Sequence, residues 1–250
     1  MPYICVPIVH SVYLPNSFHP TGPTLTTTAA FFDVDGTLTT TRVWEGIMTY
    51  FRSRNLRRAT DRLFWAVHTP YYLLHKRGLI SQVAFRTPWA AHLAWYFRNY
   101  SEAQAGEVWD WVVWDYLSSR WREDTRTMLD RHRYAGDLVM LVSAGPAPLL
   151  KRIAAELGAD HIIGTDFEIR NGRYTGRSLK PICIDENKSV LTRAYLEKLG
   201  EKVDLEMSYA YADAVSDLAL LEMVGNPVAV YPGESLRTIA TERGWRIFPS

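Results

Sequence analysis

The stretch that decides the fold is AAFFDVDGTLTTTR, which runs from Ala29 to Arg42. A short apolar run is followed by two aspartates one residue apart, and then by glycine and threonine. A run of this kind is typical of a strand that is buried on both faces of a parallel sheet. Because aspartates are poor strand formers, Asp33 and Asp35 predict the point where this strand ends and a polar site begins.

Short apolar runs alternate with helical patterns from Asp137 onward. We expect strands at 137–145, 161–166, 207–213, 227–231 and 245–248, with helices between them at 146–158, 186–200, 216–225 and 234–244. The Asn171–Gly172 pair predicts the type I′ turn of a hairpin at 167–176, because both residues tolerate positive φ. The alternation predicts an α/β fold with a Rossmann-like, doubly wound parallel sheet, in which ligands bind beyond the carboxyl ends of the strands.

The segment between the first strand and this region is helical in pattern and rich in Trp, Tyr and Arg. We interpret it as a helical cap inserted after the first strand of an α/β core. The cap is assigned to 42–133 and the core to 29–41 and 134–250. Residues 1–28 are rich in Pro, Ser and Thr and lack the pattern of a signal peptide, so we expect them to form a disordered extension.

The composition limits the classes of protein that this chain can represent. Its 250 residues, 47% hydrophobic and 22% charged, suit one globular domain or a core domain with a smaller one. A formal net charge of +1 gives no overall attraction to nucleic acid or to an acidic membrane. Cys5 and Cys183 match no metal or redox spacing, and no apolar run reaches spanning length, so we expect a reducing, cytoplasmic location.

The two aspartates of DVDGT are suited to chemistry on a phosphoryl group. Asp33 can act as a nucleophile, because carboxylates form aspartyl-phosphate intermediates. Asp35 can protonate the leaving oxygen and then deprotonate the hydrolytic water. The alternative is a helix cap or an Asx turn, since Asp and Gly are common turn residues. Taken alone, the motif leaves both interpretations open.

A second pair of carboxylates occurs in YADAVSDLALL, where Asp213 ends a predicted strand and Asp217 follows at the start of a helix. Two carboxylates beside Asp33 would repel it unless a cation neutralised them, and hard oxygen ligands suit Mg²⁺. The alternative is ordinary capping, with Asp213 or Ser216 as the N-cap and Asp217 favoured by the helix dipole. On its own, this motif favours the cap.

Two further residues are suited to holding an anion. Ser143 ends a predicted strand and is followed by small residues, which let backbone N–H groups approach an anion at the next helix start. Lys188 lies near a helix start, where the dipole disfavours a cation, and a lysine that reaches into a phosphate pocket would explain this position. A plain turn and a solvated lysine are the alternatives.

Taken together, the four motifs resemble those of the haloacid dehalogenase superfamily of phosphatases. DVDGT, SAG, a lysine and DAVSD occur in that order, each at a predicted strand end or helix start on one side of the sheet. The likeness extends from Ala29 to the C-terminus. The helical insertion after the first motif is similar to the cap of the phosphoserine phosphatase-like branch.

The resemblance implies a role for each motif residue. Asp33 would be the nucleophile and Asp35 the general acid and base, and Asp35 argues against dehalogenation because the dehalogenase branch lacks that position. Mg²⁺ would be held by the carboxylates of Asp33 and Asp213 and by the backbone carbonyl of Asp35, with Asp217 orienting its water shell. The phosphate would be held by Thr37, Ser143, Lys188 and the backbone near Gly36 and Ala144.

Two positions depart from the family pattern. Ala212 stands where relatives often have glycine, but it is small enough that we expect function to survive. Arg42 falls, by counting, where phosphoserine phosphatases carry an acidic residue that receives the substrate ammonium. Arginine favours a second anionic group instead, so we do not expect phosphoserine to be the substrate. Glu45 is nearby and would take the acidic role if the register shifts.

The cap combines basic residues at 52–62 with an aromatic and aliphatic block that follows them. One interpretation is an amphipathic surface that contacts a membrane or accepts a lipid phosphate. We favour the other, in which the apolar residues form the core of a small helical cap. Pro70 predicts a break or kink in a cap helix near Thr69. The histidines without metal-ligand spacing are expected to be structural or surface residues: His68, His75 and His92.

The sequence therefore predicts a Mg²⁺-dependent phosphomonoester hydrolase that acts through an aspartyl-phosphate, with a small phosphorylated metabolite as substrate. One alternative is a phosphatase that acts on a lipid-linked phosphate at a membrane surface. Another is a non-catalytic binding protein of the same fold, against which the intact motif residues argue. We expect no nucleic acid partner, and the sequence does not indicate an oligomeric state.

Overall fold

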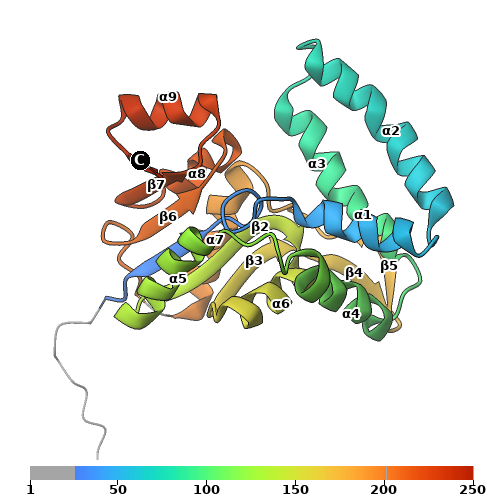
Figure 1. The fold of residues 1–250 in the computed structure, drawn as a ribbon, viewed down its shortest axis with the longest axis horizontal. Helices are drawn as coiled ribbons and strands as arrows, with labels where there is room; N and C mark the ends of the chain where they lie inside the picture. Colours follow the sequence, from blue (N-terminus) through green and yellow to red (C-terminus); the bar gives the residue numbers. More distant parts are fainter. Residues whose placement is uncertain (1–25, 201, 250) are drawn as a thin grey trace, which may run out of the picture.

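The computed structural model describes residues 26–200 and 202–249, which are built around one parallel sheet (Figure 1). Residues 1–25, most of the predicted extension, lie outside this part of the chain. The strands of the sheet are hydrogen-bonded in the order β3-β2-β1-β6-β7-β8. Their bounds are β1 Ala29–Phe32, β2 Leu138–Pro146, β3 His161–Thr165, β6 Tyr209–Ala212, β7 Asn226–Val230 and β8 Arg246–Phe248. The predicted doubly wound α/β class is confirmed.

Strand β1 is buried on both faces because its residues alternate between two apolar clusters. Ala30 and Phe32 pack in one cluster with α5 (Glu123–Ala135) and α6 (Ala147–Leu157). Ala29 and Phe31 pack in the other, with α7 (Glu186–Leu199), α8 (Leu218–Leu221) and α9 (Glu234–Glu242). Burying each phenylalanine contributes about 2 kcal/mol, so this strand fixes the centre of the sheet.

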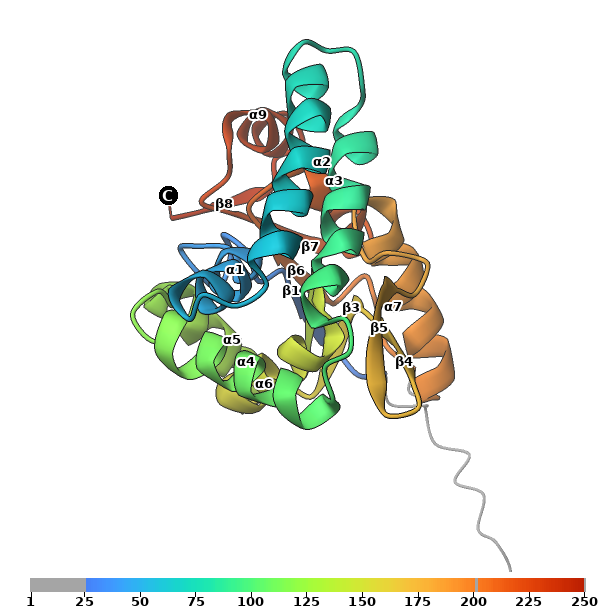
Figure 2. The ribbon, with the colours of Figure 1, turned by 90° about the vertical axis from the view of Figure 1, so that its right-hand side faces the viewer.

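The region between β1 and α5 is helical, as predicted. Its elements are α1 (Val43–Ser53), α2 (Arg58–Lys76), α3 (Gln82–His92), the 3₁₀-helix η1 (Leu93–Phe97), α4 (Glu102–Trp111) and the π-helix η2 (Val112–Tyr116). Both views show α2 and α3 as an antiparallel pair that projects beyond the rest of the molecule (Figures 1 and 2). Within the described residues, no helix combines the length and apolar character needed to cross a membrane.

A β-hairpin joins the base of this helical region to the core. Strands β4 (Phe167–Arg170) and β5 (Arg173–Ser178) pair antiparallel, and the turn residues Asn171 and Gly172 have φ of 51° and 70°. The predicted hairpin is therefore confirmed. The N–H of Tyr174 in β5 donates to the carbonyl of Tyr100 at 2.9 Å. Helix α5, by contrast, packs against β1 and β2, and the division of the chain at residues 42 and 133 stays a prediction.

Helix α2 continues through Pro70, so of the predicted break or kink near Thr69 the break does not occur, and the kink stays a prediction. Proline lacks an N–H and crowds the carbonyl four residues earlier. Here Ala66 and Pro70 are both exposed, so water can satisfy the freed carbonyl. Packing of α2 against α3 on the other side keeps the helix in one piece.

The α2–α3 pair has an aromatic core centred on Phe64 and His68, both fully buried. The Phe64 ring lies 4.3 Å from the His68 ring and 4.9 Å from the Trp89 ring, measured between centroids. His68 Nε2 lies 3.1 Å from Nδ1 of His92. Burial, with a smaller effect of His92, lowers the pKa of His68 to about 4, so this imidazole is neutral at physiological pH. A structural role for both histidines fits these contacts.

Candidate active site

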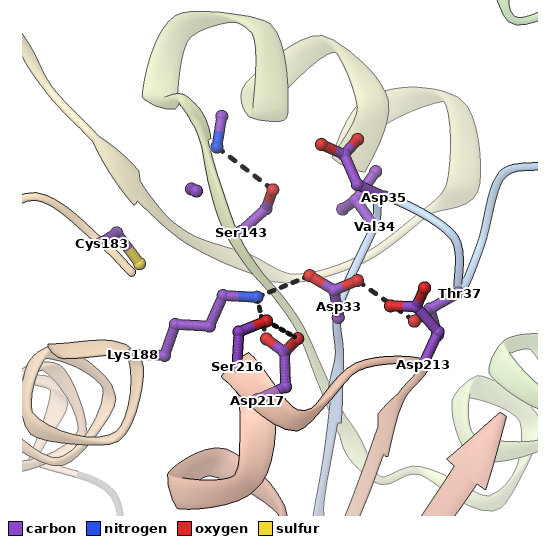
Figure 3. Close-up of polar contacts among 12 residues, drawn as sticks. Asp33, Val34, Asp35, Thr37, Ser143, Cys183, Lys188, Asp213, Ser216 and Asp217 are labelled. Atoms are coloured by element: carbon purple, nitrogen blue, oxygen red, sulfur yellow. Dashed lines mark hydrogen bonds and ion pairs between the residues drawn. The ribbon is translucent and has the colours of Figure 1, made fainter. Parts of the chain in front are cut away.

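The candidate site lies where three neighbouring strands end at the same edge of the sheet (Figure 3). Asp33 follows β1, Ser143 lies near the end of β2, and Asp213 follows β6. The backbone N–H of Asp33 donates to the carbonyl of Tyr211 at 3.0 Å, which extends the pairing of β1 with β6 by one residue. The parallel register therefore brings together side chains that are far apart in the sequence.

Lys188 joins two of the carboxylates. Its Nζ donates to Asp33 Oδ1 at 2.6 Å and also to Asp217 Oδ1, and all three side chains are buried. Asp217 ends the short 3₁₀-helix η3 (Val215–Asp217), and its second oxygen accepts a hydrogen bond from Ser216 at 3.0 Å. Lys188 lies in the first turn of α7, so the position that looked unfavourable in sequence is stabilised by two buried carboxylates.

The pKa values in this cluster depend on burial and on the excess of carboxylates over the single lysine. Burial alone would lower the pKa of Lys188, but the carboxylates of Asp217 and Asp33 outweigh that effect and raise it, so the lysine stays charged. Burial, together with Asp33 and Asp217, raises the pKa of Asp213 to about 7. One lysine therefore faces more negative charge than it can neutralise.

The excess carboxylates fit a divalent cation. Oxygen atoms of Asp33, Asp213 and Asp217 lie within 4.8 Å of one another. Asp213 Oδ1 is buried and has no hydrogen-bond partner among the described residues, which leaves a ligand atom available. Buried polar atoms are normally satisfied, and clustered carboxylates are the hard ligands that Mg²⁺ takes. The donor set thus fits the cation that the resemblance implies.

Gly36 makes the close approach of the first loop to Asp213 possible. It has a φ of +93°, and a Cβ at this position would lie 2.2 Å from Asp213 Oδ2. Only glycine satisfies both conditions, because other residues rarely adopt positive φ and any side chain would displace the carboxylate. The glycine of DVDGT is therefore a geometric requirement of the acidic cluster.

Asp35 is held apart from the Lys188 cluster. Its Oδ1 accepts a hydrogen bond from the backbone N–H of Val43, the first residue of α1, at 2.8 Å. Burial, with a smaller effect of Asp33, raises the pKa of Asp35 to about 7. A carboxyl group with this pKa can hold a proton near neutral pH and also release it, as a general acid and base requires.

The small polar residues predicted to hold phosphate lie around Asp33. The Thr37 hydroxyl donates to Asp33 Oδ2 at 3.1 Å, and Ser143 Oγ accepts from the Gly145 N–H at 3.2 Å. The pairing of β2 with β3 is irregular between Val142 and Pro146, so the Ser143–Gly145 segment leaves the ladder at the edge of the site. Ala144 lines the same cavity as Ser143 and Lys188.

The two candidate selectivity residues lie in different places. Arg42 Nη1 donates to the backbone carbonyl of Asp35 at 3.2 Å, and its Nη2 lies 3.9 Å from Asp213 Oδ2. Arg42 therefore reaches the two groups that the resemblance assigns to the metal along with Asp33. Glu45 instead accepts a hydrogen bond from the Thr41 hydroxyl at 2.7 Å, and the described lining of the cavity does not include it.

A cavity of about 710 Å³ extends from Asp33 to the α2–α3 pair. The wall outside the motifs is largely aromatic and includes a second arginine: Trp44, Trp65, Tyr72, Phe85, Arg86 and Trp89. Sequence reasoning missed these residues. Helical spacing was the signal that could have identified the cavity wall. Positions 65, 68, 69 and 72 lie on one face of α2, and positions 82, 85, 86 and 89 lie on one face of α3.

The fold and this cluster together fit one class of protein, a phosphatase. The chain belongs to the haloacid dehalogenase-like hydrolase family, whose match covers residues 30–222. The chain is thus a hydrolase of the phosphatase type, similar to the phosphoserine phosphatase-like branch.

Named relatives include phosphatases of more than one kind. The chain is 31% identical over 229 residues to a phosphoserine phosphatase of Mycobacterium tuberculosis, covering 88% of this chain and 70% of the relative. It is 28% identical over 220 residues to a histidinol-phosphatase of Neisseria meningitidis, covering 87% of this chain and 96% of that protein. These names differ in substrate, so they agree on the reaction and leave the substrate open.

Solved structures show the same fold. A Bordetella pertussis protein of unknown function superposes with a TM-score of 0.75 at 28% identity, covering 89% of this chain and 98% of its own. A phosphoserine phosphatase in its apo form superposes with a TM-score of 0.57 at 14% identity, covering 85% and 90%. The second likeness concerns the fold alone.

We expect Gly36→Ala to lower the affinity for Mg²⁺ at least about tenfold, because the new Cβ displaces the Asp213 carboxylate and the positive φ is strained. Isothermal titration calorimetry with MgCl₂ measures this. Gly172→Ala is the matched control, since Gly172 also has positive φ but no atom lies within 4 Å of its Cβ position. Equal Mg²⁺ affinity in both variants would contradict the role of Gly36.

Proposed function

We propose that the protein is a Mg²⁺-dependent phosphomonoester hydrolase that acts through an aspartyl-phosphate on Asp33. The observation that carries the proposal is the position of Asp33, buried between Lys188 and the Thr37 hydroxyl and within reach of Asp213 and Asp217. Phosphoryl transfer needs positioning and charge neutralisation more than covalent assistance, and this cluster supplies both.

In the first step, a carboxylate oxygen of Asp33 attacks phosphorus and the bond to the leaving oxygen breaks. Asp35 gives its proton to that oxygen, which leaves as an alcohol. Lys188 holds the charge of the phosphoryl oxygens, and the hydroxyl of Ser143 with the nearby backbone N–H groups orients them. The pKa of Asp35, raised to about 7 by burial, is suited to this transfer.

In the second step, water attacks the phosphorus of the aspartyl-phosphate. Asp35, now ionised, takes a proton from that water, and the bond between phosphorus and the Asp33 oxygen breaks. Inorganic phosphate leaves, Asp33 returns as a carboxylate and Asp35 as an acid. The same side chain therefore serves as acid and then as base.

The residues that would hold Mg²⁺ are Asp33 and Asp213 through their carboxylates and Asp35 through its backbone carbonyl, with Asp217 beside them. When bound, the ion supplies positive charge that offsets the crowded carboxylates and the phosphate. Arg42 contacts two of these groups.

We propose a small phosphorylated metabolite as the substrate, which the names of the relatives support. Arg42 lines the cavity where an acid would receive an ammonium, and Arg86 adds a second positive charge to the same wall. This supports a substrate with a second anionic group near the phosphate rather than phosphoserine.

We expect Asp33→Asn to lower turnover of p-nitrophenyl phosphate at least about 1000-fold, because the nucleophile is lost. Asp35→Asn should give a burst of p-nitrophenolate followed by slow turnover, since this leaving group needs no proton but the second step needs the base. Stopped-flow absorbance distinguishes the two outcomes.

Treatment with EDTA should abolish turnover, and added Mg²⁺ should restore it.

Asp130→Asn is the matched control, because Asp130 is exposed on α5 and lies outside the cavity lining among the described residues. It should behave as the wild type. Turnover retained in Asp33→Asn, or insensitive to EDTA, would sink the proposal. Failure of Asp35→Asn to show a burst would remove only the assignment of the acid and base.

A second candidate is a phosphatase for a phosphomonoester with a long apolar tail. The observation that favours it is the size and lining of the cavity, about 710 Å³ with walls largely of aromatic side chains. Pockets of this volume bury drug-sized ligands, whereas a serine-sized leaving group would leave most of the aromatic wall uncovered. The cavity therefore has room for a larger apolar leaving group than those of the substrates in the relatives' names.

A series of alkyl phosphates decides between the two candidates. If the aromatic wall holds a tail, kcat/KM should rise about fourfold per added methylene until the cavity is filled, from about 0.8 kcal/mol per CH₂. Trp65→Ala should flatten this rise, and Trp114→Ala, an exposed tryptophan outside the cavity lining, should not. A rate that stays flat or falls with chain length excludes the apolar tail and leaves the small metabolite.

A further inference from the structure

The α2–α3 pair concentrates exposed apolar side chains. It spans 58–92, and half of the large exposed hydrophobic residues among those described lie on it. They are Leu63, Trp65, Tyr71, Tyr72, Leu73, Leu74, Leu79 and Val83. Surface apolar residues are ordinary when scattered, but a contiguous set on a projecting element indicates a contact surface. We call the outer end of this pair, residues 71–83, the hairpin tip.

At the start of the hairpin tip, one turn of α2 carries apolar side chains on every side. Successive residues of a helix are about 100° apart, so the four consecutive residues Tyr71, Tyr72, Leu73 and Leu74 cover every side of α2. All four are exposed, and Leu79, in the turn that follows, has 67% of its surface exposed. A helix with apolar side chains on every side is normally buried in protein or lipid. Here each of the four side chains keeps more than a third of its surface exposed.

The charge of the same segment is one-sided. No acidic residue occurs from Arg62 to Ser101, and the 58–92 pair carries five basic residues against Asp61 alone. Asp61 is already paired with Arg52 at 2.9 Å, at the base of the pair. Lys76 and Arg77 lie at the tip and are exposed. The pair therefore has a net charge of +4 in a chain whose formal net charge is +1.

The tip is continuous with the wall of the active-site cavity. Tyr72 at its start and Gln82 near its end line that cavity together with Asp33, and Phe85, just beyond the tip, does so too. Phe85 stacks on His75 with ring centroids 5.6 Å apart, and Ser81 caps α3 through the Ala84 N–H at 3.1 Å. These contacts give the tip a defined turn structure. A partner bound to the tip would therefore lie next to the active-site cavity.

We propose that the hairpin tip docks on an anionic membrane surface, with its leucines in the interface and Lys76 and Arg77 at the level of the head groups. Exposed apolar residues flanked by basic ones are the chemistry of interfacial binding elements. A second copy of the chain is the other occupant to consider, but a symmetric contact would place the basic tips against each other. This inference goes beyond the proposed function, because it needs no step of the reaction.

Sedimentation with vesicles tests the apolar part of the contact. The full chain should bind vesicles that contain about one third phosphatidylglycerol, and bind pure phosphatidylcholine at least tenfold more weakly. Leu74→Gln with Leu79→Gln should reduce binding at least tenfold. Val190→Gln with Met207→Gln is the matched control, since Val190 and Met207 are 57% and 61% exposed but lie on the core. Equal loss in both double variants would overturn the proposal.

Charge reversal tests the electrostatic part. Lys76→Glu with Arg77→Glu should weaken binding to the anionic vesicles at least tenfold, and high salt should do the same to the wild type. Lys151→Glu with Lys198→Glu makes the same change of charge on exposed residues of α6 and α7 and should have little effect. Absence of binding by the wild type at low salt would overturn the proposal.

Two further measurements separate this inference from its alternatives. Asp33→Asn should bind vesicles as the wild type does, so failure of the proposed reaction leaves this test intact. Hydrolysis of p-nitrophenyl phosphate by the tip variants should stay at the wild-type rate, which shows that they are folded. A dimer in light scattering that the Leu74→Gln, Leu79→Gln variant disrupts would assign the tip to a second copy and contradict the membrane contact.

Discussion

Repulsion between carboxylates is the constraint on which the rest of this site depends. Asp33 is far in sequence from Asp213 and Asp217, and the parallel sheet brings the oxygens of the three side chains within 4.8 Å. Lys188 offsets part of this charge, and burial together with the charges of Asp33 and Asp217 raises the pKa of Asp213 to about 7. The loop at Gly36 approaches the Asp213 carboxylate so closely that only glycine fits at this position. Such an arrangement is stable when a cation and a phosphate complete it, which is why it indicates phosphoryl chemistry.

The helical region serves this site from two sides. Val43, at the start of α1, donates its N–H to Asp35, so the first turn of the insertion positions the side chain that we propose as acid and base. Helices α2 and α3 close the cavity above with an aromatic wall, and their outer end is exposed and basic. The inner side of these two helices therefore limits which leaving group fits the cavity, and their outer end is the part that we propose to contact a membrane.

Much of the core could be predicted from sequence, because its signals are local. AAFF marks a strand buried on both faces, and polar residues at strand ends mark the site. The cavity wall could not be predicted, because Trp44 and Trp89 meet only through tertiary packing. Whether Pro70 breaks α2 could not be predicted for the same reason, because the exposure of Ala66 and the contact with α3 decide it. The contact of Arg42 with Asp213 also depends on the folded loop.

The central claim is that Asp33 receives the phosphoryl group beside a divalent cation. A crystal structure of the protein grown with Mg²⁺ and beryllofluoride tests it most directly, since beryllofluoride mimics a phosphoryl group on a carboxylate. We expect beryllofluoride bonded to Asp33 and in contact with Lys188, with Mg²⁺ bound between Asp33 and Asp213. Beryllofluoride on another residue, or a cation that avoids these carboxylates, would contradict it.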